Sequence, residues 1–86
     1  MIGGDQNNQM QTLFRDLQTL GFSDYEAKAY IALVKLQPAT AYEVSKEAGL
    51  PKANSYSVLE SLRKKEAVQP VSQNPVRYMA TAPDTL

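Results

Sequence analysis

The stretch TAYEVSKEAGLPKANSYSVLESLRKK, residues 40–65, decides the fold. Its first half places Thr40 three residues before Glu43, the spacing of a capping box that begins a helix. That half ends at Gly49, a residue type that readily takes the left-handed conformation of a helix terminus. The connection after it is short, and a longer helix then runs from about Lys52 to Lys65. The stretch therefore predicts a short helix, a tight turn and a longer helix, which is the helix-turn-helix plan.

Apolar side chains mark one side of the longer helix. Val58, Leu59 and Leu62 fall together on a helical wheel and predict its buried side. The outward side is small and polar near its start and basic near its end, and it consists of Ala53, Asn54, Ser57, Ser61 and Lys64. In the helix-turn-helix plan this longer helix enters the major groove of DNA, so the outward side is a candidate DNA-binding face.

Two further helices are predicted upstream of this pair. The first helix is indicated by apolar residues at three-and-four spacing before Gly21, namely Met10, Leu13, Phe14, Leu17 and Leu20. Ser23 and Glu26 form a second capping box, which begins a helix with a broad apolar stripe that ends at Pro38. Residues 1–9 carry no periodic apolar signal and are predicted to form a flexible lead-in.

Downstream of the longer helix the pattern changes to short strands. Residues 68–71 and 76–80 are predicted to pair as a hairpin around the turn-forming residues 72–75, with Pro70 limiting the first strand to a sheet edge. Residues 82–84 could begin another helix. The fold class expected from this order is mainly α with a small β-hairpin, a winged helix-turn-helix domain over residues 10–82, followed by a tail or the start of another segment at 83–86.

Composition limits the possible functions. The chain has 86 residues, which fit one domain, and it contains no cysteine and no histidine. Disulfides and the usual thiolate or imidazole metal sites cannot be built, and there is no glycine-rich phosphate loop. We therefore expect no enzyme activity, no cofactor and no metal site. Without a long apolar run or a signal-peptide pattern, we expect a cytoplasmic protein with no membrane partner.

Charge is distributed unevenly along the chain. The net charge is zero, which by itself argues against nucleic acid, because DNA affinity depends on cationic side chains that neutralise phosphates. Residues 1–49 hold four basic and six acidic groups, whereas residues 50–80 hold five basic and two acidic groups. This bias favours double-stranded DNA as the partner. The alternative, favoured by the neutral total, is a winged helix that binds another protein.

Several motifs in the chain resemble a known family. They are LGFSDYEAKAY at 20–30, PATA at 38–41, GLPK at 49–52 and YSVLESL at 56–62, and the likeness continues through Arg77-Tyr78 and Ala82-Pro83. Together they make residues 17–86 resemble the N-terminal DNA-binding domain of the TrmB family of sugar-responsive transcriptional regulators. The resemblance implies a DNA-binding regulator whose sugar effector binds a region that this chain does not contain. The chain is then a fragment of a regulator or a stand-alone domain.

The chain departs from this family's pattern at two positions. Such domains usually carry Lys-Gly between the recognition helix and the first wing strand, where this chain has Lys65-Glu66-Ala67. An aliphatic residue is usual where Ser55 stands. We therefore expect a different helix exit and a slightly looser core.

Nine residues are candidates for DNA contact, and each has a structural alternative. The candidates are Thr40, Lys52, Ala53, Asn54, Tyr56, Ser57, Ser61, Lys64 and Arg77. Asn54 can pair with adenine, and Lys52 lies beside it at the helix start, where first-turn capping is the alternative. Thr40 is first a helix cap, and core packing is favoured for Tyr56.

The remaining candidates are expected at the surface, whether they contact DNA or only solvent. The two serines can bond bases or phosphates or face solvent. Lys64 belongs to the charge run Arg63-Lys64-Lys65, which is typical of a solvated helix face but lies near enough to the wing to contact phosphate. Arg77 projects from the wing. The other tyrosines, at 25, 30, 42 and 78, are predicted to lie in the core or an interface. Because a nearly neutral monomer should bind DNA weakly, we expect a homodimer.

Overall fold

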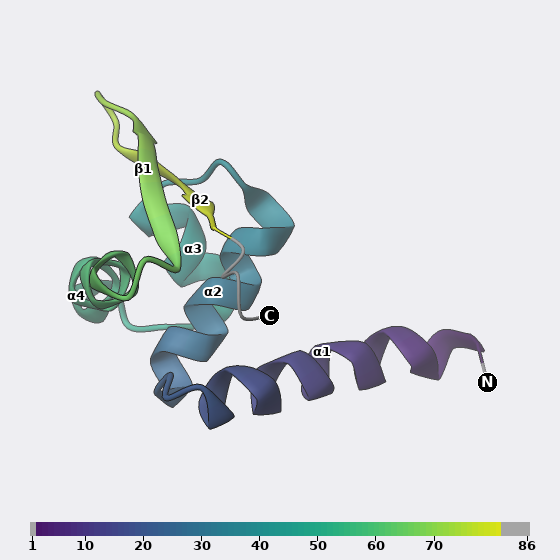
Figure 1. Ribbon diagram of the computed structural model, residues 1–86. Helices are drawn as coiled ribbons and strands as arrows, with labels where there is room; N and C mark the ends of the chain where they lie inside the picture. Colours follow the sequence, from purple (N-terminus) through teal and green to yellow (C-terminus); the bar gives the residue numbers. More distant parts are fainter. Residues whose placement is uncertain (1, 82–86) are drawn as a thin grey trace.

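The computed structural model describes residues 2–81, with side chains from Gln11 onward (Figure 1). This part of the chain forms four helices followed by a two-stranded antiparallel hairpin. The elements are α1 (Ile2–Thr19), α2 (Asp24–Leu36), α3 (Ala41–Ala48), α4 (Lys52–Lys64), β1 (Val68–Ser72) and β2 (Arg77–Ala80). The predicted order of a winged helix-turn-helix domain is confirmed.

Both predicted capping boxes are present. The Ser23 hydroxyl accepts from the Glu26 amide at 3.1 Å, and the Glu26 carboxylate accepts from the Ser23 amide at 2.8 Å. The corresponding distances between Thr40 and Glu43 are 3.2 and 2.9 Å. Gly49 ends α3 in the left-handed conformation with a φ of 72°. These local signals set the bounds of the helix-turn-helix pair as the sequence indicates.

The core lies where α2, α3 and α4 meet. Leu33 from α2, Val44 from α3 and Leu59 and Leu62 from α4 are almost completely buried. Ser55 is also buried, with 2% of its surface exposed, and its hydroxyl lies 3.4 Å from the Pro51 carbonyl oxygen. A serine can therefore occupy this inward position because its hydroxyl bonds within its own helix.

The hairpin is attached to the helices by a backbone bridge. In the wing, Val68 pairs with Ala80, and the register shifts between Pro70 and Ser72. On its other side, β2 meets the loop between α2 and α3: the Ala39 amide donates to the Tyr78 carbonyl oxygen at 3.1 Å, and the Tyr78 amide donates to the Ala39 carbonyl oxygen at 2.8 Å. This pair of bonds fixes the wing against the helix-turn-helix pair.

The first helix is longer than the sequence predicts. Residues 2–9, expected to form a flexible lead-in, are the first turns of α1, which therefore begins eight residues before Met10. This stretch contains no proline, and lengthening an existing helix requires little of each added residue, so a weak apolar pattern does not prevent it. The beginning of α1 projects away from the other elements (Figure 1), whereas Leu17 near its end is buried in the core. The molecule measures 43 × 25 × 21 Å.

Several apolar and aromatic residues are more exposed than predicted. Tyr56 is 67% exposed, so it does not pack in the core as predicted. Of the tyrosines predicted to lie in the core or an interface, Tyr30 is buried, whereas Tyr25 and Tyr42 are exposed and lie outside the core. Leu20 and Leu36, assigned to apolar stripes, are also exposed because each lies at the last turn or just beyond the end of its helix. The helix start predicted at residues 82–84 lies outside the described residues.

The end of α4 is held to the turn between α1 and α2. The Lys65 ammonium lies 2.7 Å from a Glu26 carboxylate oxygen and 3.0 Å from the Gly21 carbonyl oxygen. It also lies 5.1 Å from the centre of the Phe22 ring, within cation–π range. Burial raises the pKa of Glu26, but hydrogen bonds from Lys65 and Ser23 outweigh it and the net shift is downward. Lys65 is thus a structural residue, unlike the solvated lysine expected from the charge run.

The next residue, Glu66, adopts a left-handed conformation with a φ of 62°. A residue with a Cβ atom pays about 1 kcal/mol or more for this conformation, which glycine adopts freely. The helix exit thus keeps the backbone path that a glycine would favour, although the sequence places a glutamate there. The replacement of the family's usual glycine by Glu66 therefore does not require a different path for the chain after α4.

We expect Glu66→Gly to raise the free energy of unfolding by about 0.5 to 1 kcal/mol, because glycine removes the strain at a small cost in unfolded-state entropy. Urea unfolding monitored by circular dichroism measures the change. Glu66→Ala is the control, since alanine removes the carboxylate but retains the Cβ atom. An equal gain in both variants would show that charge, and not backbone strain, limits stability at this position.

Candidate nucleic-acid interface

One face of α4 is turned away from the core along its whole length. At about 100° per residue, the direction opposite Ser55, Val58, Leu59 and Leu62 is occupied by every third or fourth residue. These residues, all exposed, are Ala53, Ser57, Glu60 and Lys64. We call them the outer face of α4. Small side chains near its beginning leave the helix backbone accessible, which suits insertion into a groove.

Glu60 was not among the residues predicted for this face. The sequence reading selected small, polar and basic residues, although the spacing of seven from Ala53 and of three from Ser57 places Glu60 between Ser57 and Lys64. Asn54 and Ser61, which were predicted there, lie toward one flank, and Ser61 is only half-exposed. Helical spacing alone, without regard to side-chain type, places Glu60 on the outer face.

Tyr56 and Arg63 lie on the other flank, which faces the wing. Burial raises the pKa of the Tyr78 hydroxyl on β2, and the charges of Glu60 and Tyr56 raise it further while Arg63 opposes them. The Tyr78 hydroxyl is thus within electrostatic range of these α4 side chains, and β1 of the same hairpin packs against α4. The wing stands beside the outer face of α4, as a winged helix that reads DNA requires.

Arg63 and Glu60 form an ion pair on this surface. The Arg63 Nε donates to Glu60 Oε1 at 3.1 Å, and Nη2 of the same guanidinium donates to Oε2. The hydrogen bond from Arg63 lowers the pKa of Glu60 and raises the pKa of Arg63. Of the predicted charge run at residues 63–65, Arg63 and Lys65 are thus engaged with carboxylates, and Lys64 extends from the outer face.

Tyr42, Lys46 and Lys52 form a second exposed group beside α4. The ammonium groups of Lys46 and Lys52 lie 5.6 and 5.5 Å from the centre of the Tyr42 ring. They come from α3 and from the first turn of α4, so the group lies at the helix-turn-helix junction. Sequence reasoning missed Tyr42 and Lys46, although their spacing of four residues on an exposed helix face was a usable signal.

The nine predicted contact residues are all at the surface of the described chain. Lys52, Ala53, Asn54, Tyr56, Ser57, Lys64 and Arg77 are exposed, and Thr40 and Ser61 are half-exposed. Thr40 acts as the predicted helix cap, and the Ser57 hydroxyl donates to the Asn54 carbonyl oxygen at 3.0 Å. Arg77 begins β2 and pairs with Ser72 on the wing. Within α4, Ala53, Ser57 and Lys64 lie on the outer face, Asn54 and Ser61 on one flank, and Lys52 and Tyr56 on the other. Their contact with DNA remains a prediction.

Several cations on this side are available to a ligand. Among residues 11–81, three salt bridges occur, and their cations are Lys35, Arg63 and Lys65. Four other exposed cations of this part of the chain lie near α4 or on the wing and form none of these salt bridges. They are Lys46, Lys52, Lys64 and Arg77. Their charges can therefore neutralise phosphates without first breaking an intramolecular ion pair.

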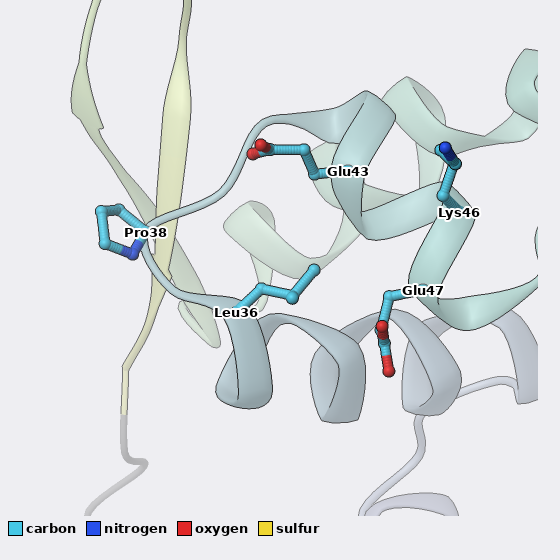
Figure 2. Close-up of a pocket in the computed structure, with 5 residues that line it drawn as sticks. All are labelled: Leu36, Pro38, Glu43, Lys46 and Glu47. Carbon is cyan, nitrogen blue, oxygen red and sulfur yellow. The ribbon is translucent and has the colours of Figure 1, made fainter.

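A separate shallow pocket of about 360 Å³ lies between the end of α2 and α3 (Figure 2). It is lined by Leu36, Pro38, Glu43, Lys46 and Glu47. Glu43 already accepts a hydrogen bond from the Thr40 amide, and Glu47 faces Lys35 at 3.8 Å. The pocket thus offers few uncommitted polar groups to a small ligand.

Neither a membrane span nor a metal cluster is found in the described part of the chain. No helix within residues 2–81 has the length and apolar character needed to cross a membrane. Among the same residues, no three acidic side chains gather as they would around a metal ion.

Comparison with known proteins identifies the family. The family model described as "Sugar-specific transcriptional regulator TrmB" matches residues 17–84. The HTH-type sugar sensing transcriptional regulator TrmBL1 of Pyrococcus furiosus is 38% identical over 74 residues, which are 86% of this chain and 22% of that protein. The uncharacterized protein YrhO of Bacillus subtilis is 50% identical over 46 residues, 54% of this chain and 17% of its own. The chain thus spans about a fifth of the length of these relatives.

Solved structures agree with this assignment. TrmBL2, described as an archaeal chromatin protein with a novel mode of DNA binding, superposes with a TM-score of 0.79 at 29% identity, over 87% of this chain and 29% of that one. The MarR family regulator SPO1453 from Silicibacter pomeroyi superposes with a TM-score of 0.66 at 15% identity, over 93% of this chain and 60% of that one, and supports the fold alone. With its family match over residues 17–84 and its winged helix-turn-helix fold, the chain belongs to the TrmB family of sugar-specific transcriptional regulators.

Proposed function

We propose that this chain binds double-stranded DNA sequence-specifically, as the DNA-reading module of a transcriptional regulator. The observation that carries the proposal is the outer face of α4, exposed along the helix and flanked by the wing. α4 enters the major groove, and the hairpin lies on the flanking backbone or in the minor groove. The DNA binding of TrmBL2 and the regulatory role of TrmBL1 support this proposal.

The residues at the start of α4 divide the tasks of recognition. Asn54 reads an adenine edge, Ala53 permits close approach, and Lys52 neutralises a phosphate, while the hydroxyls of Ser57 and Ser61 bond bases or backbone. These assignments follow from the surface position of all five residues and, for Lys52, Ala53 and Asn54, from the first-turn position that usually meets base edges.

Residues beside α4 contact the phosphate backbone. The group of Tyr42, Lys46 and Lys52 offers two ammonium groups and a phenol hydroxyl at one place, and Tyr56 adds a second exposed hydroxyl. The free amides at the beginning of α3, next to Thr40, favour an anion. Lys64 and Arg77 extend the contact toward the wing. Such contacts position the module and leave sequence discrimination to Asn54 and the small polar residues of α4.

The active species that we propose is a homodimer in the cytoplasm. The net charge of zero makes a single module a weak DNA binder, and two modules related by a two-fold axis can share one operator. The sugar effector of the family binds outside this chain. Sedimentation of the 86-residue chain with a selected operator tests the dimer, and a single chain that binds a half-site with nanomolar affinity would rule it out.

The decisive experiment measures DNA affinity against salt concentration. Each neutralised phosphate contributes about −0.9 to the slope of log affinity against log salt, so contacts from Lys46, Lys52, Lys64 and Arg77 predict a slope of about −3.6 per chain. Fluorescence anisotropy with a labelled duplex pool gives this slope. No binding even at low salt would favour the alternative, a winged helix that binds another protein, which the neutral net charge supports.

Two variants of the first turn separate the two kinds of contact. Lys52→Gln is expected to weaken binding to all sequences and to reduce the salt slope by about 0.9, whereas Asn54→Ala is expected to lose about tenfold only on the preferred sequence. Lys28→Gln, at an exposed lysine of α2, is the control for charge. Unchanged DNA binding in both first-turn variants would remove α4 as the recognition helix.

A further inference from the structure

The position of Glu60 conflicts with simple phosphate binding. Its carboxylate lies in the middle of the outer face of α4, between Ser57 and Lys64, and the other charged group of that face, Lys64, is a cation. A carboxylate that faces DNA phosphates is repelled unless something in the groove donates a hydrogen bond to it. Glu60 is therefore either a cost to binding or a group that reads a particular base.

The pairing of Glu60 with Arg63 favours the second reading. The guanidinium donates to both carboxylate oxygens, which holds the side chain in one orientation and offsets its charge. Each carboxylate oxygen can still accept another hydrogen bond, because an ionised carboxylate has about four acceptor sites. The pair thus presents an oriented, acceptor-only edge to the groove.

Resting on the proposed function, we propose that Glu60 is a specificity-determining residue that selects a C·G pair by accepting a hydrogen bond from the N4 amino group of cytosine. Among the base edges of the major groove, cytosine presents a donor without an adjacent acceptor, and glutamate is a partner suited to it. Guanine and thymine present acceptors that repel the carboxylate. Adenine presents a donor beside the N7 acceptor, which an acceptor-only side chain cannot satisfy.

The helix geometry also places this base within the operator. Glu60 follows Asn54 by six residues, which is about 9 Å along α4 at 1.5 Å per residue. The cytosine is therefore expected at a different position of the half-site from the adenine read by Asn54, because the two side chains extend from separate turns of the helix. This spacing distinguishes the two contributions in a selected sequence.

The experiment selects bound sequences from a random duplex pool with the 86-residue chain and with Glu60→Gln. For the wild type we expect a cytosine preference of about tenfold at one position in each half-site. Glutamine offers a donor and an acceptor that match adenine, so in Glu60→Gln the preference at that position should change from cytosine to adenine while the other positions stay as they are. Glu47→Gln, which removes an exposed, ion-paired carboxylate from α3, should leave the profile unchanged.

The outcomes separate this inference from the proposed function. If Glu60→Gln binds every sequence more tightly and selects the same operator, Glu60 acts only through repulsion and the inference is wrong while DNA binding stands. If the wild type selects no sequence but binds with a steep salt slope, sequence reading by Glu60 fails and backbone binding remains. If the wild type does not bind the pool at low salt, the proposed function fails and the inference with it.

Discussion

Replacing Ala53 with glutamate is expected to reduce DNA affinity by at least about a hundredfold without destabilising the fold. Ala53 lies at the second position of α4 and is exposed on the face proposed to enter the groove. A carboxylate there meets phosphates and base acceptors at close range, a placement that costs several kcal/mol in a charged interface. The same charge interacts favourably with the N-terminal end of the helix dipole, so the free energy of unfolding should hold or rise slightly.

DNA affinity and fold stability are expected to change in different directions in Ala53→Glu, so a loss of binding cannot be attributed to unfolding. Anisotropy with the selected operator measures affinity, and thermal unfolding monitored by circular dichroism measures stability. Ala53→Gln, which has the same size without the charge, should lose much less affinity and so separates bulk from repulsion. Wild-type affinity in Ala53→Glu would show that the first turn of α4 does not face DNA.

The second large effect is expected at Glu26, where alanine should lower the free energy of unfolding by about 2 kcal/mol. Glu26 is 7% exposed, and its carboxylate both closes the Ser23 capping box and receives the Lys65 ammonium. Loss of the hydrogen bond from the Ser23 amide costs about 1 kcal/mol, and loss of a largely buried ion-pair partner adds a similar amount. Glu47→Ala, which breaks the exposed pair with Lys35, should change stability by less than about 0.5 kcal/mol.

The Glu26 contribution should also depend on pH. Because the pKa of Glu26 in the folded chain lies below its ordinary value of 4.5, the folded chain binds the proton less readily than the unfolded chain. The stabilisation is therefore fully present above about pH 4.5 and is lost as the pH falls through the lowered pKa. Urea unfolding of the wild type and Glu26→Gln should show a stability difference near neutral pH that narrows below pH 4.5. A constant difference would contradict the ion-pair account.

The features of the fold that were predicted from sequence depend on residues close together in the chain. The capping boxes at Ser23 and Thr40 act over three residues, and the left-handed Gly49 acts at a single position. The hairpin depends on a short run of turn-forming residues, and its strand bounds differ from the prediction by one residue. Each of these signals is visible without knowledge of the tertiary structure.

What the sequence did not reveal depends on contacts between distant segments or on helix continuation. The bridge from Ala39 to Tyr78 and the contact of Lys65 with Glu26 each join residues 39 positions apart. The left-handed conformation of Glu66 follows from how the wing must leave α4, not from the preference of glutamate. The early start of α1 reflects the small cost of extending a helix, which periodicity of apolar residues does not measure.

Part of the candidate site was visible in the sequence and part was overlooked. The helical pattern correctly made Ala53, Ser57 and Lys64 an exposed face, but attention to residue types favourable for DNA left out Glu60. Tyr56 was expected in the core because it borders the apolar stripe, yet it is 67% exposed since smaller Ser55 takes the inward position. Residue type alone therefore does not predict which side chains are exposed at the edge of a helix face.

The contacts of Lys65 join the end of α4 to the turn that follows α1. The ammonium holds the end of α4 to Gly21 and Phe22, directly after the point where α1 ends, and α1 extends 18 residues from there. At 1.5 Å per residue that arm is about 27 Å long, so a rotation of about 10° at the turn moves its far end by about 5 Å. Because Lys65 joins this turn to the end of α4, a movement of α1 about the turn would act on α4 at Lys65.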